Sequence, residues 1–418
     1  MTRTALWDSP WPAEDAGSQR RSTPHDQGGL EKSLGLHLTA PLVASSRDIL
    51  VLTMAILRDP GELFVVGHSG PPDATSFVEQ LDPSSLETVR RSEDLAGGPV
   101  WPGGIAAHAN GSLYVVFGNH AHRLSASLET LCSVELPRDR PYNSFVILET
   151  GHLVTKDFAG PFHGHDPDDT RTSQLLVLDP NDLSTISTLD LSEPSVARLS
   201  AIENEIVVVG TTSRLTVVFE NDALRETGSV PYRSEPGQGC GWDAVLDGDL
   251  TYFLDNGDGT DRFDGSFEGR GIGTVPLRLH RIDRNNSTSS SVEVSGRLGG
   301  IIANPPALDA TRRIVVGFDS GNGVVAAFHA DTLAPLWTAE LNHASHVLHD
   351  DVSGHMILTH YDRTRAVEEV VILETETGRE VNRIDTGSPV QSVVFPCAGF
   401  NNDFYLVSFT TITRISNS

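Results

Sequence analysis

Lysine is scarce in this chain, so each copy is informative. Lysine and arginine together number 30 among 418 residues, and only Lys32 and Lys156 are lysines. Lys156 lies in the apolar segment LVTKDF, where an ammonium can bind an anion, donate to a carbonyl, or act as an amine nucleophile once desolvated. The competing interpretation is an ion pair with the neighbouring Asp157. Lys156, together with Tyr142 and Asn143, is our first candidate for catalysis or ligand binding.

Polar and aromatic residues recur at equivalent ends of the predicted strands. Arg198 and Asp255 are further candidates for acid–base chemistry, with Asp157. The candidate substrate-binding residues are Trp101, His120, Trp242, Asp243, Asn256, Asp319, His346, His360 and Gln391. Convergent polar groups with a few aromatic rings are typical of a small-molecule pocket. The alternative is that Asp and Asn at strand ends satisfy the backbone of turns.

Histidine is frequent at the same strand ends, which suggests a metal. Imidazole suits zinc, copper and iron, and the candidate ligands are His68, His120, His346 and His360. A loop, HGHDPDD at 163–169, is a further candidate. No HExxH pattern supports them, so the sequence leaves a divalent metal open.

One glycine-rich loop resembles a cation-binding loop in part. DNGDGTD at 255–261 alternates oxygen ligands with glycine, but no glutamate follows at the twelfth position of a calcium loop. The segment continues through FDGSFEGRGIG, whose glycine density is typical of a lid. We expect a flexible loop over 257–275 and leave its role as a lid open.

Other catalytic templates are absent from the sequence. There is no GxSxG elbow, no GxxxxGK[ST] phosphate loop, and no GxGxxG between a strand and a helix. Cys240 is flanked by glycines and is expected to pack as a small apolar residue, with a nucleophile as the alternative.

The elements that would hold these residues repeat along the chain. A short apolar motif recurs eight times, starting at Leu63, Leu113, Leu153, Ile206, Leu250, Ile314, Met356 and Phe404. Each copy follows another apolar run and a turn rich in Gly, Asn or Asp, which predicts a β-hairpin. Seven copies are followed by a further strand, turn and strand, as in LDPSSLETV from Leu81. The pattern predicts an all-β protein, a single β-propeller of eight four-stranded blades, with seven as the alternative.

The two ends of the chain complement each other. The sequence stops one strand after the eighth hairpin, so the eighth unit lacks its outer strand, which the segment LHLTAPLVA at 36–44 can supply. Residues 1–35 are rich in Pro, Ser, Gln and charge and are predicted to be a mobile arm, with the propeller over 36–418. Deletion of 1–30 is therefore expected to leave stability nearly unchanged.

Composition restricts the partners. The 56 acidic residues give a formal net charge of −26, which opposes contact with nucleic acid and with anionic membranes. No segment reads as a secretory signal or a membrane span, and three scattered cysteines do not form a disulfide framework. We expect a cytoplasmic protein with a small-molecule ligand.

At the level of this repeat the chain resembles the eight-bladed propellers of the quinoprotein alcohol dehydrogenase-like superfamily. The resemblance covers about residues 36–418 and concerns architecture. Members that use pyrroloquinoline quinone typically carry a tryptophan-docking repeat and often a vicinal disulfide. This chain has five tryptophans and no adjacent cysteines, so this quinone is not expected.

Two functions remain open at this point. The first is an enzyme that converts a small organic molecule in the axial funnel by acid–base or Lewis-acid chemistry, of lyase, isomerase, cyclase or hydrolase type. The second is a non-catalytic propeller that serves as a scaffold or ligand-binding module, because the fold itself does not choose between them.

Overall fold

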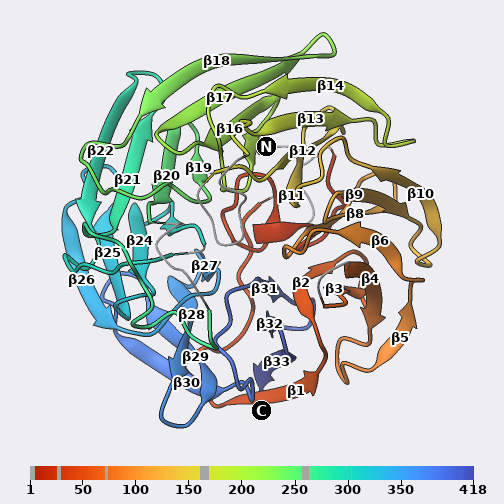
Figure 1. Ribbon diagram of the computed structural model, residues 1–418. Coiled ribbons are helices and arrows are strands. Elements are labelled where there is room, and N and C mark those ends of the chain that lie inside the picture. The colour runs from red at the N-terminus through yellow and green to blue at the C-terminus, as the bar shows by residue number, and fades with distance from the viewer. Residues whose placement is uncertain (1–4, 26–29, 71–73, 161–168, 257–262, 303) are drawn as a thin grey trace.

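Eight β-sheets surround a central axis in the computed structural model (Figure 1). The structure describes residues 5–25, 30–70, 74–160, 169–256, 263–302 and 304–418. The sheets follow one another around the ring in chain order, and each is an antiparallel meander. The prediction of an eight-bladed propeller is confirmed, and the seven-bladed alternative is not.

The blades are numbered by the order of their innermost strands. Blade 1 contains β2 (Leu52–Leu57), β3 (Leu63–His68), β4 (Ala74–Leu81), β5 (Thr88–Arg91) and an extra strand, β6 (Leu95–Gly98). Blade 2 contains β7 (Gly104–Ala107), β8 (Leu113–Phe117), β9 (His120–Leu124) and β10 (Thr130–Glu135). Blade 3 contains β11 (Tyr142–Ile147), β12 (Leu153–Asp157), β13 (Gln174–Leu178) and β14 (Thr185–Asp190). Blade 4 contains β15 (Ser200–Ile202), β16 (Glu205–Val209), β17 (Ser213–Glu220) and β18 (Ala223–Pro231).

The second half of the ring repeats this arrangement. Blade 5 contains β19 (Val245–Asp247), β20 (Leu250–Leu254), β21 (Arg278–Asp283) and β22 (Thr288–Glu293). Blade 6 contains β23 (Ala307–Asp309), β24 (Ile314–Asp319), β25 (Val324–His329) and β26 (Pro335–Glu340). Blade 7 contains β27 (Leu348–Asp350), β28 (His355–Asp362), β29 (Val367–Glu374) and β30 (Glu380–Asp385). Blade 8 contains β31 (Pro396–Ala398), β32 (Asp403–Val407), β33 (Thr411–Asn417) and, as its outer strand, β1 (Leu42–Asp48).

Burial along the strands explains the sequence pattern. The second strand of blade 2, β8, has the sequence LYVVF and is buried at every residue, because both of its faces pack against neighbouring blades. The outer strand β10 alternates between half-buried and exposed residues, because it lies at the rim of the ring. The continuous apolar runs of the sequence therefore mark the second strands.

An N-terminal strand closes the ring as predicted, but this strand lies further along the chain than the predicted segment. β1 pairs antiparallel with β33, and Leu42 lies opposite Asn417. The predicted segment was 36–44, whereas the observed strand ends at Asp48. Leu36 and Leu38 are buried before the strand begins, so their apolar character reflects packing against the ring and not strand pairing.

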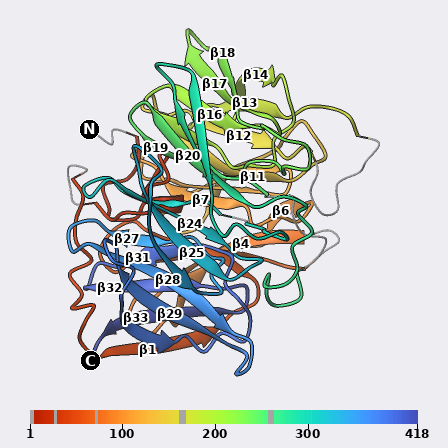
Figure 2. The same cartoon turned by 90° about the vertical axis from the view of Figure 1, so that its left-hand side faces the viewer.

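The N-terminal segment is ordered, which corrects the expectation of a mobile arm for the residues described here. Residues 5–25, which we call the plug, lie in the middle of the ring (red in Figure 1) and toward one face of it (Figure 2). Trp11 is fully buried, and the chain makes one three-residue 3-10 turn, η1 (Glu14–Ala16).

Backbone hydrogen bonds hold the plug to the inner strands. Its carbonyl oxygens accept hydrogen bonds from six backbone amides on blades 1, 2, 4, 5 and 7, namely Leu57, Ala107, Ala109, Ala201, Leu246 and His349, at 2.7–3.0 Å. The innermost strand of a blade has a free edge toward the axis, and its buried amides need acceptors. The plug supplies them, which is the physical reason that this polar segment is not a solvated arm.

Helix is nearly absent from the described residues. Within them, no helix has the length and apolar character needed to cross a bilayer.

Candidate functional site

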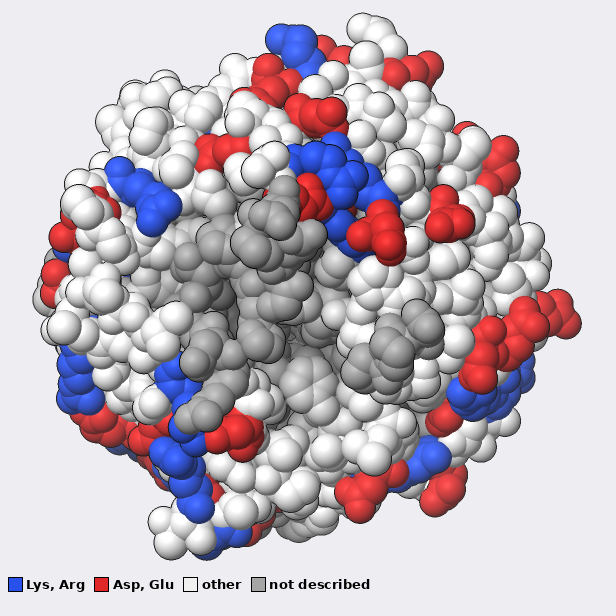
Figure 3. All heavy atoms as spheres, viewed as in Figure 1, with Lys and Arg blue, Asp and Glu red and all other residues white. Residues whose placement is uncertain are grey.

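Residues that precede the innermost strands gather at one end of the axis, opposite the plug. We call this end the mouth. Its residues include Trp101 before β7, Arg198 before β15, Trp242 before β19 and His346 before β27. Figure 3 shows the face at this end hollowed at its centre. These four members of the predicted polar ring each lie just before an innermost strand, and their surroundings differ.

Charged side chains of the plug meet the mouth residues on the axis. Arg198 Nη1 lies 2.9 Å from Asp243 Oδ2, and Arg198 Nε lies 3.0 Å from Oε1 of Glu14. Arg20 forms ion pairs with Glu14 and, at 3.1 Å, with Asp15. All five side chains are buried. This buried set binds the plug to blades 4 and 5, because separating it would leave unpaired charges in the interior.

His346 joins the plug from the other side of the axis. Its Nδ1 lies 2.7 Å from Asp15 Oδ1, and its ring is 3.9 Å from that of Phe395. Burial by itself would raise the pKa of Asp15, but His346 and Arg20 outweigh it and lower that pKa to about 2. His346 Nε2 is buried and has no hydrogen-bond partner among the described residues.

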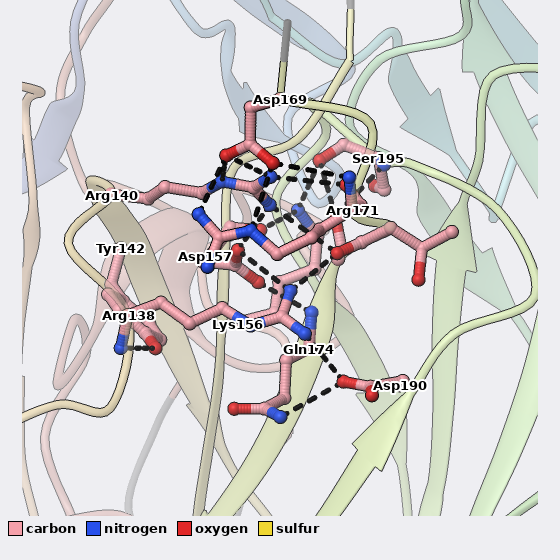
Figure 4. A network of polar contacts seen from close by, with 12 residues as sticks. Arg138, Arg140, Tyr142, Lys156, Asp157, Asp169, Arg171, Gln174, Asp190 and Ser195 are labelled. Atoms are coloured by element: carbon pink, nitrogen blue, oxygen red, sulfur yellow. Dashed lines mark hydrogen bonds and ion pairs between the residues drawn. The ribbon is translucent and has the colours of Figure 1, made fainter. Parts of the chain in front are cut away.

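Lys156 is fully buried between blades 3 and 4, and carbonyl oxygens surround its amine. Nζ donates to the Ser195 carbonyl at 2.9 Å and lies 3.5 Å from the Asp157 carbonyl (Figure 4). It is 5.1 Å from the centre of the Phe158 ring. Burial lowers the pKa of the amine to about 7, even though the Asp157 and Asp243 carboxylates favour the cation. A large fraction of this amine is therefore uncharged near neutral pH.

An aromatic wall lies beside Lys156. The Phe158 ring is 4.8 Å from that of Trp101 and 6.4 Å from that of Trp242, both in edge-on geometry. Trp242 Nε1 is buried and has no hydrogen-bond partner in the described part of the chain. A buried donor without an acceptor requires an explanation, and a bound molecule is one.

Asn304 provides an acceptor near the axis. Its Nδ2 donates to the carbonyls of Ala344 and Val393, which belong to blades 7 and 8, so this blade 6 side chain extends toward the centre of the ring. Its Oδ1 is buried with no partner among the described residues. Blades 3, 5, 6 and 7 thus each contribute a buried polar group with spare hydrogen-bonding capacity.

The other members of the first candidate group point elsewhere. The Asp157 carboxylate accepts hydrogen bonds from Arg138 and Arg140, at 3.3 and 2.8 Å, and from the Gln174 amide (Figure 4). The Tyr142 hydroxyl accepts from the Arg138 amide, and burial raises its pKa. Hence Asp157 is held by arginines and not by Lys156, and Tyr142 does not face the amine. The Asn143 side chain lies outside the described residues.

Three predicted site residues instead hold turns and neighbouring strands together. Asp255 accepts hydrogen bonds from the Arg278 amide, from Gln238 and from His280. Asp319 accepts from Ser295 and from the Ile301 amide, and Asn256 accepts from the Gly239 amide. This is the alternative that the sequence left open for strand-end Asp and Asn.

Gln391 fixes the described half of the long loop. Its Oε1 accepts from the Phe267 backbone amide at 2.8 Å, and its own backbone N–H donates to the Gly265 carbonyl. Phe267 is buried against Ile301 and Ala344. Residues 263–275 therefore pack over blades 6–8, whereas residues 257–262 of the predicted loop, with Asp258 and Asp261, lie outside the described residues.

The four candidate histidine ligands are not brought together. Nδ1 of His68 contacts the Ser69 carbonyl, Nδ1 of His120 contacts the Gly97 carbonyl, and Nδ1 of His360 accepts from the Asn342 amide. Burial lowers the pKa of His68 and of His360. His346 contacts Asp15, as described above. Most of the HGHDPDD loop lies outside the described residues, and within it Asp169 pairs with Arg140 and Arg171.

Sequence reasoning missed the contribution of the plug. Glu14, Asp15 and Arg20 contact the mouth residues, yet they lie in a segment that composition assigned to solvent. Trp7 and Trp11 were the available signal, because two tryptophans within a short polar segment indicate an anchored chain. Phe158 and Phe395 were also missed, because aromatic residues in apolar strands read as core.

Comparison with known proteins identifies the fold. No protein-family model and no curated protein sequence matches the chain. Quinohemoprotein alcohol dehydrogenase from Pseudomonas putida is similar in structure, with a TM-score of 0.66, 10% identity, and coverage of 98% of this chain and 80% of that one. A europium-containing methanol dehydrogenase has a TM-score of 0.63 at 10% identity, covering 95% of this chain and 89% of that one. BamB from Moraxella catarrhalis has a TM-score of 0.56 at 13% identity, covering 90% and 100%.

The chain is thus an eight-bladed propeller with the architecture of the quinoprotein alcohol dehydrogenase-like superfamily, which confirms the resemblance. At these identities the likeness concerns the fold alone.

The axial residues do not fit the quinone used by some proteins of this shape. Pyrroloquinoline quinone is a polyanion and needs an excess of positive charge. The two guanidiniums at the axis, those of Arg20 and Arg198, face three carboxylates, Glu14, Asp15 and Asp243, and both are already ion-paired with them. Cys240 is a buried cysteine in the thiol form.

Proposed function

We propose that the protein is an enzyme acting on a small carbonyl compound bound at the mouth of the axial channel, with Lys156 as the reactive amine. The observation that carries this proposal is the burial of Lys156 beside the Phe158 ring and the Ser195 carbonyl, with burial lowering the pKa of its amine to about 7. An uncharged amine is a nucleophile, whereas an ordinary lysine is almost fully protonated at neutral pH.

The chemistry follows from the surroundings of the amine. The nitrogen adds to the carbonyl carbon of the substrate, the carbonyl oxygen leaves as water, and an imine forms at Nζ. The Asp243 carboxylate favours positive charge on Nζ, and so it would favour the protonated imine as well. A protonated imine acidifies the adjacent carbon, which supports lyase or isomerase chemistry.

The remaining mouth residues would position the substrate. Trp101, Phe158 and Trp242 offer an apolar wall, and Trp242 Nε1 offers a donor for a substrate oxygen. Asn304 on blade 6 offers a buried acceptor, its Oδ1. Such a site suits a small, largely uncharged molecule, because both axial guanidiniums are already ion-paired with carboxylates.

The chain contains its own control for a test of this proposal, since Lys32 is exposed. The protein is incubated at pH 7.5 with small aldehydes and ketones in the presence of cyanoborohydride, which traps imines as stable amines, and peptides are then mapped by mass spectrometry. We expect preferential labelling of Lys156 over Lys32, with labelling retained in Lys32→Arg and lost at position 156 in Lys156→Met.

The contrary outcome is equally clear. Labelling confined to Lys32 and the N-terminus would reject the reactive amine and favour the non-catalytic scaffold or ligand-binding module.

A further inference from the structure

We infer that the protein has a divalent-cation site at the plug end of the ring, formed by Asp309, His349 and Asp351. One ligand atom from each residue lies within 4.8 Å of the others, and all three side chains are buried. Asp309 ends the inner strand of blade 6, and His349 and Asp351 belong to the end of the inner strand of blade 7. The site thus joins two blades at the end opposite Lys156.

The imidazole of His349 lies between the two carboxylates, with one ring nitrogen toward each. Nδ1 contacts Asp351 Oδ1, and Nε2 lies 3.7 Å from Asp309 Oδ2 and 3.3 Å from Thr375 Oγ1. In a tetrahedral site, ligand atoms at about 2.0–2.2 Å from zinc lie roughly 3.3–3.6 Å apart. Metal binding would therefore require the side chains to close in by about 1 Å and the imidazole to turn one nitrogen toward the ion.

One buried oxygen within the cluster lacks a partner. Among the described residues, Oδ2 of Asp351 has no hydrogen-bond partner, and Arg21 Nη2 lies 3.6 Å from it, whereas Oδ1 contacts His349 Nδ1. The side chains of both residues are about 1% exposed. Buried carboxylates need a cation or several donors, and a bound metal ion supplies the cation.

The local charge supports a cation. Three carboxylates gather here, those of Glu31, Asp309 and Asp351. Two guanidiniums face them: Arg312 pairs with Asp309 at 3.0 Å, and Arg21 lies 2.8 Å from Glu31 and 3.6 Å from Asp351. Three negative against two positive charges leave the cluster with a net negative charge, which favours a bound cation.

A cavity lies on the plug side of the cluster. It has a volume of about 430 Å3 and lies between the plug and the ends of the inner strands of blades 3 and 4. Arg21 and Glu31 line this cavity, and Arg21 also contacts Asp351. None of the three ligand residues lines it, so an ion that enters from this side has to pass Arg21 and Glu31.

One imidazole and two carboxylates suit zinc or manganese better than calcium, which prefers an all-oxygen site. The His349 amide donates to the Ser22 carbonyl of the plug at 2.9 Å, so an ion held by His349 would also stiffen the attachment of the plug.

The test begins with metal-free protein, prepared with EDTA and titrated calorimetrically with ZnCl2, MnCl2 and CaCl2. We expect one equivalent of zinc or manganese to bind, with weaker binding of calcium. Asp351→Asn and His349→Gln should each lower zinc affinity at least about tenfold. The matched control is Asp331→Asn in the exposed His329 and Asp331 pair of blade 6, which should leave affinity unchanged.

A second measurement uses the wild-type protein, so its result does not depend on whether a variant folds. X-ray absorption of the zinc-loaded protein should show one imidazole with oxygen ligands. Absence of stoichiometric binding, a first shell with sulfur or several imidazoles, or equal affinity in folded Asp351→Asn would each overturn the inference.

Discussion

Burial of Lys156 gives stability a dependence on pH that can be measured. Its pKa is about 7 in the folded protein, against 10.5 for an ordinary lysine, so between these values the unfolded chain binds a proton that the folded chain lacks. The contribution of this residue to stability therefore rises as pH increases from 7 to 10.5. At and below pH 7 the burial of the amine is fully destabilising.

Replacement of Lys156 by methionine, which has a similar length and no charge, tests this dependence. We expect Lys156→Met to increase the free energy of unfolding near pH 6.5 by a few kcal/mol, on the order set by the pKa change. The gain should shrink toward zero above pH 10. Urea unfolding of the variant and of the wild type at both pH values measures this gain in the free energy of unfolding. Lys32→Met is the exposed control. An equal gain at both pH values would contradict the lowered pKa of Lys156.

For single residues, the sequence predicted where a residue lies in the fold better than it predicted which groups its side chain contacts. Lys156 stood out because lysine is rare, and the structure does place it in a buried and unusual environment. Asp255 and Asp319 occupy equivalent strand ends, yet they bond to turns and strands, because a sequence shows that a residue lies at a strand end without showing which groups face it. The cluster of Asp309, His349 and Asp351 combines two blades, and no spacing within the sequence reveals it.

Among the elements, the plug departs most from its prediction. Its composition is that of a solvated arm, but its carbonyls meet the free edges of five inner strands. The composition of the plug cannot predict this pairing, because the need for hydrogen-bond acceptors belongs to the inner strands that line the channel and not to the plug. The strands could be predicted because their own apolar residues are the ones that become buried when the blades pack.

The two tryptophans of the plug provide a matched pair for its anchoring. Trp11 is fully buried in the core of blades 1 and 8, whereas Trp7 is only partly buried and donates to Asp59. Trp11→Ala should lower the free energy of unfolding by about 3–5 kcal/mol, as large core truncations do, and Trp7→Ala by clearly less. Chemical denaturation of both variants checks this; equal and small losses would mean that the plug is weakly attached.

At the scale of the whole molecule, one chain segment both fills the axis and closes the ring. The plug precedes β1, and β1 covers the edge of β33. These two roles can be separated by truncation. The earlier expectation that loss of residues 1–30 is nearly neutral no longer holds, because the plug forms ion pairs and backbone hydrogen bonds with most of the blades.

Deletion of residues 1–25 should give a folded monomer with a lower melting temperature, since the ring remains closed by β1. Deletion of residues 1–48 should instead expose the edge of β33 and cause self-association through it. Light scattering coupled to size-exclusion chromatography distinguishes the two, alongside thermal melts. Monomers of the same stability in both cases would show that β1 does not close the ring.

Closure by β1 also constrains how the protein is made. Asp48 and its partner Thr411 are 363 residues apart in the chain. At a synthesis rate of about 5–20 residues per second, the first strand waits roughly 20–70 s on the ribosome before its partner has been added. During that interval the blades already made form an open arc with an unpaired end, so newly synthesised chains have a long period in which a chaperone, or a neighbouring chain, can reach that edge.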